Sequence, residues 1–184
     1  MPSFKDIFPP KIARVHEVYG PGAVIFAALA APKEKSVLWV HERWKSVAIN
    51  PQGLLPFLDP SHVLIAGAPD QTSALSVAEE ALRSGVIPFV VTEISRPMDL
   101  REGRRLQLAA KTGHATGLCI IPEGMGSNAA DTRWMATPVF DPSKNDSTLI
   151  RVKLIKNKTG TCGAWDVEWD PKTHCVHVVS SVSE

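Results

Sequence analysis

Four short runs of almost wholly apolar residues constrain the fold of this chain more than any other feature. They occupy residues 37–40, 62–66, 86–92 and 117–121. An extended segment precedes them, and segments with the apolar spacing of helices lie between them or just before them. A strand that is apolar throughout is buried on both faces, as parallel strands covered by helices are. The pattern therefore predicts an α/β fold with a mainly parallel sheet flanked by helices.

The pattern changes in the last part of the chain. Residues 149–158 alternate apolar with basic side chains, and in the next run Trp165, Val167 and Trp169 alternate with acidic residues. Turn residues separate these two runs from each other and from a third run, 174–180. Alternation with a period of two is typical of strands with one face on the core. We expect a C-terminal antiparallel meander attached to the parallel sheet, all within a single domain, 1–184.

Composition and charge place the chain among soluble proteins and exclude several classes of function. Its 20 Lys and Arg and 19 Asp and Glu give a formal net charge of +1, so any nucleic-acid contact needs a local patch. The longest apolar run falls far short of the roughly 20 residues of a membrane-spanning helix. The amino terminus lacks the pattern of a signal peptide, and three cysteines are expected to be reduced thiols in the cytoplasm. His174 and His177 would face opposite sides of a strand, so no metal site is expected.

A turn of Gly20, Pro21 and Gly22 joins the first extended segment to the first helix, which is the setting of a phosphate-binding loop. The working loop reads G-x-x-x-x-G-K-[ST]: its amides and lysine hold phosphate and its hydroxyl holds magnesium. Counted from Gly20, the lysine position is Phe26 and the hydroxyl position is Ala27. Either this loop has lost its nucleotide chemistry, in which case no cofactor is expected, or it is only a tight turn into a core helix.

The order of these segments resembles the ATPase core of the RecA recombinase family. VLWVHE, which ends at Glu42, is similar to that family's second strand and its water-activating carboxylate. ALRSGVIPFVVTE, which ends at Glu93, is similar to the helix and Walker B strand. RVKLIKNK contains Lys156 and Lys158, which match two lysines that reach the nucleotide of a neighbouring subunit. The resemblance implies a RecA-like core in which, without the lysine and hydroxyl of the loop, Glu42 and Glu93 are relics.

Four segments also resemble the inducible mutagenesis protein A (ImuA) family: EEALRSG, RRLQLAAKTG, DTRWMATPV and KNKTGTCGAWDVEWD. Members of that family are RecA-like proteins made during the SOS response to DNA damage. The resemblance implies a role in mutagenic translesion synthesis and two partners, an inactive Y-family polymerase homologue and an error-prone replicative-type polymerase. RecA itself and single-stranded DNA are further candidate partners, and no membrane contact is expected.

Basic residues gather in three places that are candidates for binding a partner or nucleic acid. The loop 124–130, which precedes the second of them, stands where RecA has its second DNA-binding loop. A solvated helix face and a core tryptophan are the alternatives that the pattern leaves open. The candidates are Arg101, Arg104 and Arg105 in a helix, Arg133 and Trp134 after the loop, and Arg151, Lys153, Lys156 and Lys158 in the late strand.

These observations favour a non-catalytic RecA-like adaptor that binds other proteins of SOS mutagenesis and has no catalytic residue of its own. A divergent ATPase is one alternative, supported by Glu42, Glu93, Lys156 and Lys158. An SOS cell-division inhibitor is another, because that family is similar to this chain around ALRSG and the strand that follows. The KNKTGTCGAWDVEWD segment is foreign to that family.

Overall fold

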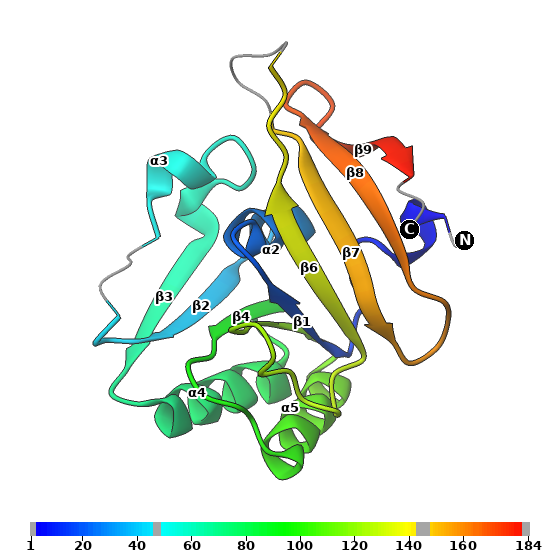
Figure 1. Cartoon of the computed structure of the whole chain (residues 1–184). Helices are drawn as coiled ribbons and strands as arrows, with labels where there is room; N and C mark the ends of the chain where they lie inside the picture. Colours follow the sequence, from blue (N-terminus) through cyan, green and yellow to red (C-terminus); the bar gives the residue numbers. More distant parts are fainter. Residues whose placement is uncertain (1–2, 46–48, 143–147, 182–184) are drawn as a thin grey trace.

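The computed structural model describes residues 3–45, 49–142 and 148–181. The described strands form one nine-stranded sheet in the order β3-β2-β4-β5-β1-β6-β7-β8-β9 (Figure 1). The first six strands in this order run parallel, and β7, β8 and β9 extend the sheet as an antiparallel meander. The expected fold class is confirmed. The strands are β1 (Val15–Tyr19), β2 (Val37–Glu42), β3 (Val63–Ala68), β4 (Phe89–Glu93), β5 (Thr116–Ile120), β6 (Thr132–Pro138), β7 (Ile150–Asn157), β8 (Gly163–Asp170) and β9 (Cys175–Ser181).

Helices cover both faces of the parallel part of the sheet. α4 (Gln71–Ser84) and α5 (Leu100–Gly113) lie side by side on one face, and α2 (Ala23–Ala30) lies on the other (Figure 1). No helix among the described residues is both long and apolar enough to cross a membrane. The shorter helical segments are α1 (Phe4–Ile7), α3 (Pro51–Leu54) and the 3-10 helix η1 (Pro60–His62).

Side-chain caps fix where the two long helices begin. The carboxylate of Asp70 accepts a hydrogen bond of 2.7 Å from the amide of Ser73 at the start of α4. Asp99 and Glu102 form a reciprocal capping box at the start of α5. α4 ends before Gly85, whose φ of +67° is a left-handed conformation that glycine adopts without strain. These local signals fix where α4 begins and ends and where α5 begins.

The parallel strands send alternate side chains into two separate hydrophobic cores. Trp39, Val91 and Leu118 belong to the core under α2. Their neighbours Val40 and Val90 belong to the core under α4 and α5. A strand with both faces buried needs apolar residues at nearly every position, which explains the continuous runs of β2, β4 and β5.

Three strands differ from the expectation. β3 was expected to be buried on both faces, but it lies at the edge of the sheet, and its Leu64 and Ile65 are 50% and 57% exposed. β4 begins at Phe89, after Pro88, because proline has no N–H to donate to the ladder. β6 was not anticipated, because its buried positions hold Thr132 and Ala136 beside Trp134, and partly exposed Arg133 and Met135 lie between them. β6 pairs in parallel with β1 and in antiparallel with β7, so it joins the two parts of the sheet.

Candidate functional site

The turn at the place of a phosphate-binding loop is short and is attached to β6. β1 ends at Tyr19 and α2 begins at Ala23, so three residues connect them. The amide of Gly22 donates a hydrogen bond of 2.9 Å to the carbonyl oxygen of Ala136. Gly20 has a φ of +97°, and a Cβ atom there would lie 2.5 Å from the same oxygen. The Gly22 amide is therefore hydrogen-bonded within the protein, whereas a phosphate-binding loop would direct such an amide at its ligand.

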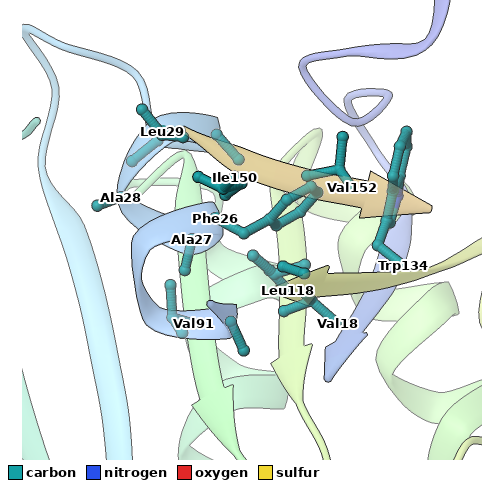
Figure 2. Close-up of a cluster of buried hydrophobic side chains, with 14 of the residues drawn as sticks. Val18, Phe26, Ala27, Ala28, Leu29, Val91, Leu118, Trp134, Ile150 and Val152 are labelled. Atoms are coloured by element: carbon teal, nitrogen blue, oxygen red, sulfur yellow. The ribbon is translucent and has the colours of Figure 1, made fainter. Parts of the chain in front are cut away.

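Phe26, at the position of the phosphate-binding lysine, is part of the hydrophobic core. Its side chain is 1% exposed, and its ring lies 5.3 Å from that of Trp134 and 5.5 Å from that of Phe8, measured between centroids. Figure 2 shows the Phe26 ring between the α2 backbone and the sheet, next to Val152 and Leu118. Ala27, at the hydroxyl position, is also buried. Both positions thus contribute packing in place of polar groups.

Glu93 at the end of β4 is held by two side chains of the protein. Trp39 Nε1 donates a hydrogen bond of 2.9 Å to Glu93 Oε1, and the ammonium group of Lys45 lies 3.5 Å from Oε2. Because side chains alternate along a strand, Glu93 lies on the same face as Val91 and Trp39, the face that α2 covers.

Glu42 at the end of the neighbouring β2 lies on the opposite face, with Val40. It is buried, and its Oε1 accepts a hydrogen bond of 3.0 Å from Trp44 Nε1. Its other oxygen, Oε2, is buried without a hydrogen-bond partner among the described residues. Burial acts to raise the pKa of Glu42, but nearby Ser95 and Trp44 and the charge of Lys45 outweigh it and lower the pKa. The sheet thus separates the two candidate carboxylates.

Lys156 and Lys158, which were expected to match two lysines of RecA, both contact the loop 124–130 of their own chain. Lys156 Nζ donates hydrogen bonds to the carbonyl oxygens of Asn128 (2.8 Å) and Ala130 (2.9 Å), and Lys158 Nζ donates one of 2.7 Å to that of Ala129. Burial and the neighbouring charges of Arg133 and Lys158 lower the pKa of Lys156. In this structure the two lysines fasten the loop.

Arg133 fastens the same loop from β6. Its Nε lies 2.8 Å from Oε2 of Glu17, a fully buried residue of β1. Its guanidinium also donates a hydrogen bond of 3.0 Å to the Ser127 carbonyl. The other carboxylate oxygen of Glu17 accepts the Ser127 amide at 2.7 Å. The ion pair of Glu17 and Arg133 therefore holds both backbone groups of Ser127.

Trp134 was a candidate platform for stacking bases, and the structure corrects this assignment. Its side chain is fully buried, and its Nε1 donates a hydrogen bond of 2.8 Å to Thr132 Oγ1. A base-stacking platform needs an exposed ring face. The alternation of β6 turns Arg133 outward and Trp134 inward, because adjacent residues of a strand face opposite sides.

The remaining basic candidates are divided between paired and exposed side chains. Arg151 on β7 forms a two-bond ion pair with Asp166 on β8 (2.7 and 2.9 Å), and partly exposed Lys153 lies two residues further along the same face. On α5, Arg105 lies 2.6 Å from Glu79 of α4. Arg101 and Arg104 are exposed and form no ion pair with another described residue. Arg133 and Lys156 pair across β6 and β7, so the candidates of these two strands meet at the loop 124–130.

Sequence reasoning missed Glu17 and its neighbour His16. Both are fully buried in β1, on opposite faces. Two adjacent polar residues inside a strand that is otherwise buried are a signal that could have been read, since buried polar groups require partners. Apart from the Lys11 carbonyl oxygen, their partners lie more than 100 residues away, at Thr132, Arg133 and Ser127, so these pairings could not be inferred from spacing.

Comparison with known proteins defines the fold. No protein-family model matches the chain, and no curated protein matches it in sequence. Among solved structures, the crystal structure of the RadB recombinase is similar with a TM-score of 0.62 and 13% sequence identity, over 92% of each chain. At this identity the similarity concerns the arrangement of strands and helices. The chain thus has the RecA-like fold that its segments implied.

Proposed function

We propose that this chain is a RecA-like protein that works without hydrolysing ATP, as an accessory adaptor in SOS-induced mutagenic translesion synthesis in the cytoplasm. The observation that carries the proposal is the turn at Gly20–Gly22. Its Gly22 amide bonds the Ala136 carbonyl, and Phe26 is buried below it. Phosphoryl transfer depends on positioning and on electrostatic stabilisation by amides, lysine and magnesium. A turn closed on its own protein supplies none of these.

The other residues of the RecA pattern support the same proposal, because they bind parts of the chain. Lys156 and Lys158 bind carbonyl oxygens of the loop 124–130, and Glu93 binds Trp39 and Lys45. Groups that serve a nucleotide in an ATPase here stabilise the fold. A protein of this kind acts through its surfaces.

The identity of the partners rests on the ImuA resemblance. We propose the inactive Y-family polymerase homologue and the error-prone replicative-type polymerase as partners, with RecA and single-stranded DNA as further candidates. Co-purification of the tagged chain from cells after DNA damage, with and without nuclease, tests this directly. We expect both polymerase components to be retained after nuclease treatment. Recovery of neither component would contradict the adaptor role.

Nucleotide binding tests the non-catalytic part of the proposal. A ligand present at 100 times its Kd stabilises a protein by about 2.7 kcal/mol, which moves the melting temperature of a chain of this size by about 5 to 10 °C. We expect no such shift with millimolar ATP and magnesium. Saturable binding of ATP, together with ATP hydrolysis that Glu42→Gln abolishes, would overturn the proposal that the chain is non-catalytic.

A second candidate function, a divergent ATPase, is favoured by one observation. Glu42 Oε2 is buried without a well-formed hydrogen bond to a described residue, although the Ser95 side chain and the Gln71 backbone lie close to the carboxylate, and buried oxygens of this kind are rare in folded proteins. A ligand would supply the missing partner. Under this function, ATP and magnesium stabilise the natural chain more than the Glu42→Gln variant, whereas the adaptor function predicts equal melting curves with and without nucleotide for both.

A further inference from the structure

An open groove of about 600 Å³ lies on the α2 side of the sheet. Its walls come from parts of the chain that are far apart in sequence: the amino-terminal segment, the end of α2 and the chain after it, the starts of β4 and β5, and the turn between β8 and β9. In Figure 1 the amino-terminal segment lies beside the meander, at the side of the sheet away from β3. None of the residues of the Gly20–Gly22 turn or of the basic candidates of α5, β6 and β7 lines this groove.

The lining of the groove is mainly apolar and partly exposed. Ile12 is 73% exposed, and Phe8 and Val176 are partly exposed against the hydrophobic core. Four prolines, including Pro32 and Pro88, line it as well. Proline fixes its own backbone angle, so these walls lose little freedom when a partner binds. Exposed apolar surface rimmed by polar groups marks a binding surface.

The charged side chains of the lining are all basic. Lys5, Lys33 and Lys35 line the groove and no Asp or Glu does, although the chain has 19 acidic residues against 20 basic ones. None of the three lysines forms an ion pair with another described residue. An unpaired basic rim around an apolar groove is complementary to apolar and acidic side chains together.

Lys33 has the best-defined position of the three. Its Nζ donates a hydrogen bond of 2.9 Å to the Phe57 carbonyl oxygen and lies 4.3 Å from the centroid of the Trp169 ring. Burial lowers the pKa of Lys33 to about 8. A carboxylate that arrives at this ammonium group stabilises its charged form, so the interaction is stronger than at an ordinary exposed lysine.

We propose that this groove binds a segment of a partner protein that carries apolar and acidic side chains. The proposal rests on the proposed function, in which the chain acts by binding proteins, and it assigns the surface that does so. Apolar anchors of the segment fill the space beside Trp169 and Ile12, and its carboxylates meet Lys5, Lys33 and Lys35. Interfaces of this kind combine a central apolar pocket with a polar rim.

Two cysteines give an internal control for the test. Cys175 is exposed and lines the groove, whereas Cys162 is exposed in the turn before β8 and does not. A library of random peptides of about 12 residues, the length that peptide-binding grooves recognise, is displayed on phage and selected on the natural protein. The enriched peptides are then synthesised, and alkylation of both cysteines by iodoacetamide is followed by mass spectrometry with and without each peptide.

We expect the enriched peptides to be apolar and net negative, and to slow the alkylation of Cys175 but not of Cys162. At ten times its Kd a peptide occupies about 90% of the sites, so alkylation slows about tenfold. The double variant Lys5→Glu/Lys35→Glu should bind these peptides at least about tenfold more weakly, the loss of about 1.4 kcal/mol. The control Arg43→Glu/Lys111→Glu reverses two exposed charges outside the groove and should bind them unchanged.

Other occupants give different results in the same assay. Protection of Cys175 by dodecanoate in place of any peptide identifies a small amphiphile, and protection by a thymidine oligonucleotide identifies nucleic acid. Concentration-dependent self-association that Lys5→Glu/Lys35→Glu removes identifies a second copy. Each of these results overturns the proposal, as does a selection that enriches no acidic peptide able to protect Cys175. All of these measurements use the isolated protein, so they stand apart from the ATP and co-purification tests of the proposed function.

Discussion

The amide of Gly22 donates a hydrogen bond of 2.9 Å to the carbonyl oxygen of Ala136, and this bond attaches the start of α2 to the middle of β6. Gly20 approaches the same carbonyl oxygen so closely that a Cβ atom would lie 2.5 Å from it. The two glycines therefore serve contact with β6. In a phosphate-binding loop, glycines at this place allow the backbone to approach a phosphate.

Substitution of Gly20 tests this contact. Gly20→Ala places a side chain at a φ of +97° and against the Ala136 carbonyl oxygen, so it suffers both backbone strain and a steric clash. The backbone strain alone costs about 1–2 kcal/mol of the free energy of unfolding. Because the clash adds to the strain, we expect Gly20→Ala to lower the free energy of unfolding, measured with urea, by more than this amount.

Gly124→Ala is the matched control for this prediction. Gly124 also has a positive φ, of +79°, but a Cβ atom there would have no neighbour within 4 Å. We expect this variant to lose only the part of the stability that backbone strain accounts for. Equal losses for the two variants would show that the contact with Ala136 is unimportant.

Replacement of Phe26 tests whether the lysine position has become part of the core. Phe26 is 1% exposed and packs against Trp134 and Phe8, so Phe26→Ala should lower the free energy of unfolding by about 3–5 kcal/mol. Phe140, which is 87% exposed, provides the control, and Phe140→Ala should change it by less than about 0.5 kcal/mol. A Phe26→Ala variant as stable as the natural chain would contradict the packing seen in Figure 2.

The buried pair of Glu17 and Arg133 is suited to a double-mutant cycle. Removal of one partner leaves an uncompensated buried charge, so Arg133→Met should cost about 3–5 kcal/mol. Glu17→Gln should also destabilise the chain. The double variant should lose less free energy of unfolding than the two single variants lose together. Urea unfolding of the four proteins measures the coupling. Arg101→Met, a change at an exposed arginine of α5, is the control and should be nearly neutral.

The fold could be predicted from the sequence because its determinants are local and periodic. The apolar runs and the alternation of Trp165, Val167 and Trp169 each depend on neighbours within a few residues. Their combination leaves few arrangements other than a parallel sheet with a meander. β6 was missed because the signals of buried and exposed residues are mixed in its seven positions.

The candidate site was harder to predict because its contacts join distant parts of the chain. The types of Lys156, Lys158 and Arg133 suggested binding to an outside partner, but each charged group has carbonyl or carboxylate partners within the protein. Nothing in the residue types distinguishes these two uses of a positive charge. The groove was missed for the same reason, since its walls are brought together only by folding.

His16 lies at the centre of a chain of buried hydrogen bonds. Trp134 Nε1 donates to Thr132 Oγ1, and the Thr132 hydroxyl lies 2.7 Å from His16 Nδ1. His16 Nε2 lies 2.9 Å from the carbonyl oxygen of Lys11, which can only accept, so Nε2 carries the proton. In the neutral ring with its proton on Nε2, Nδ1 accepts a hydrogen bond from the Thr132 hydroxyl. Burial lowers the pKa of His16 below its ordinary value of 6.5.

The stability of the chain should therefore fall on mild acidification. Below pH 6.5 the unfolded chain binds a proton at His16 that the folded chain does not. The free energy of unfolding therefore decreases as the pH is lowered, by at most about 1.4 kcal/mol per pH unit. Above pH 6.5 this contribution is constant. Urea unfolding between pH 5 and 8 should show the slope in the natural chain and in His177→Gln, which changes an exposed histidine. His16→Gln should be less stable at pH 8, but its free energy of unfolding should lack this part of the dependence on pH. A dependence that is unchanged in His16→Gln would mean that the His16 ring is already charged in the folded protein.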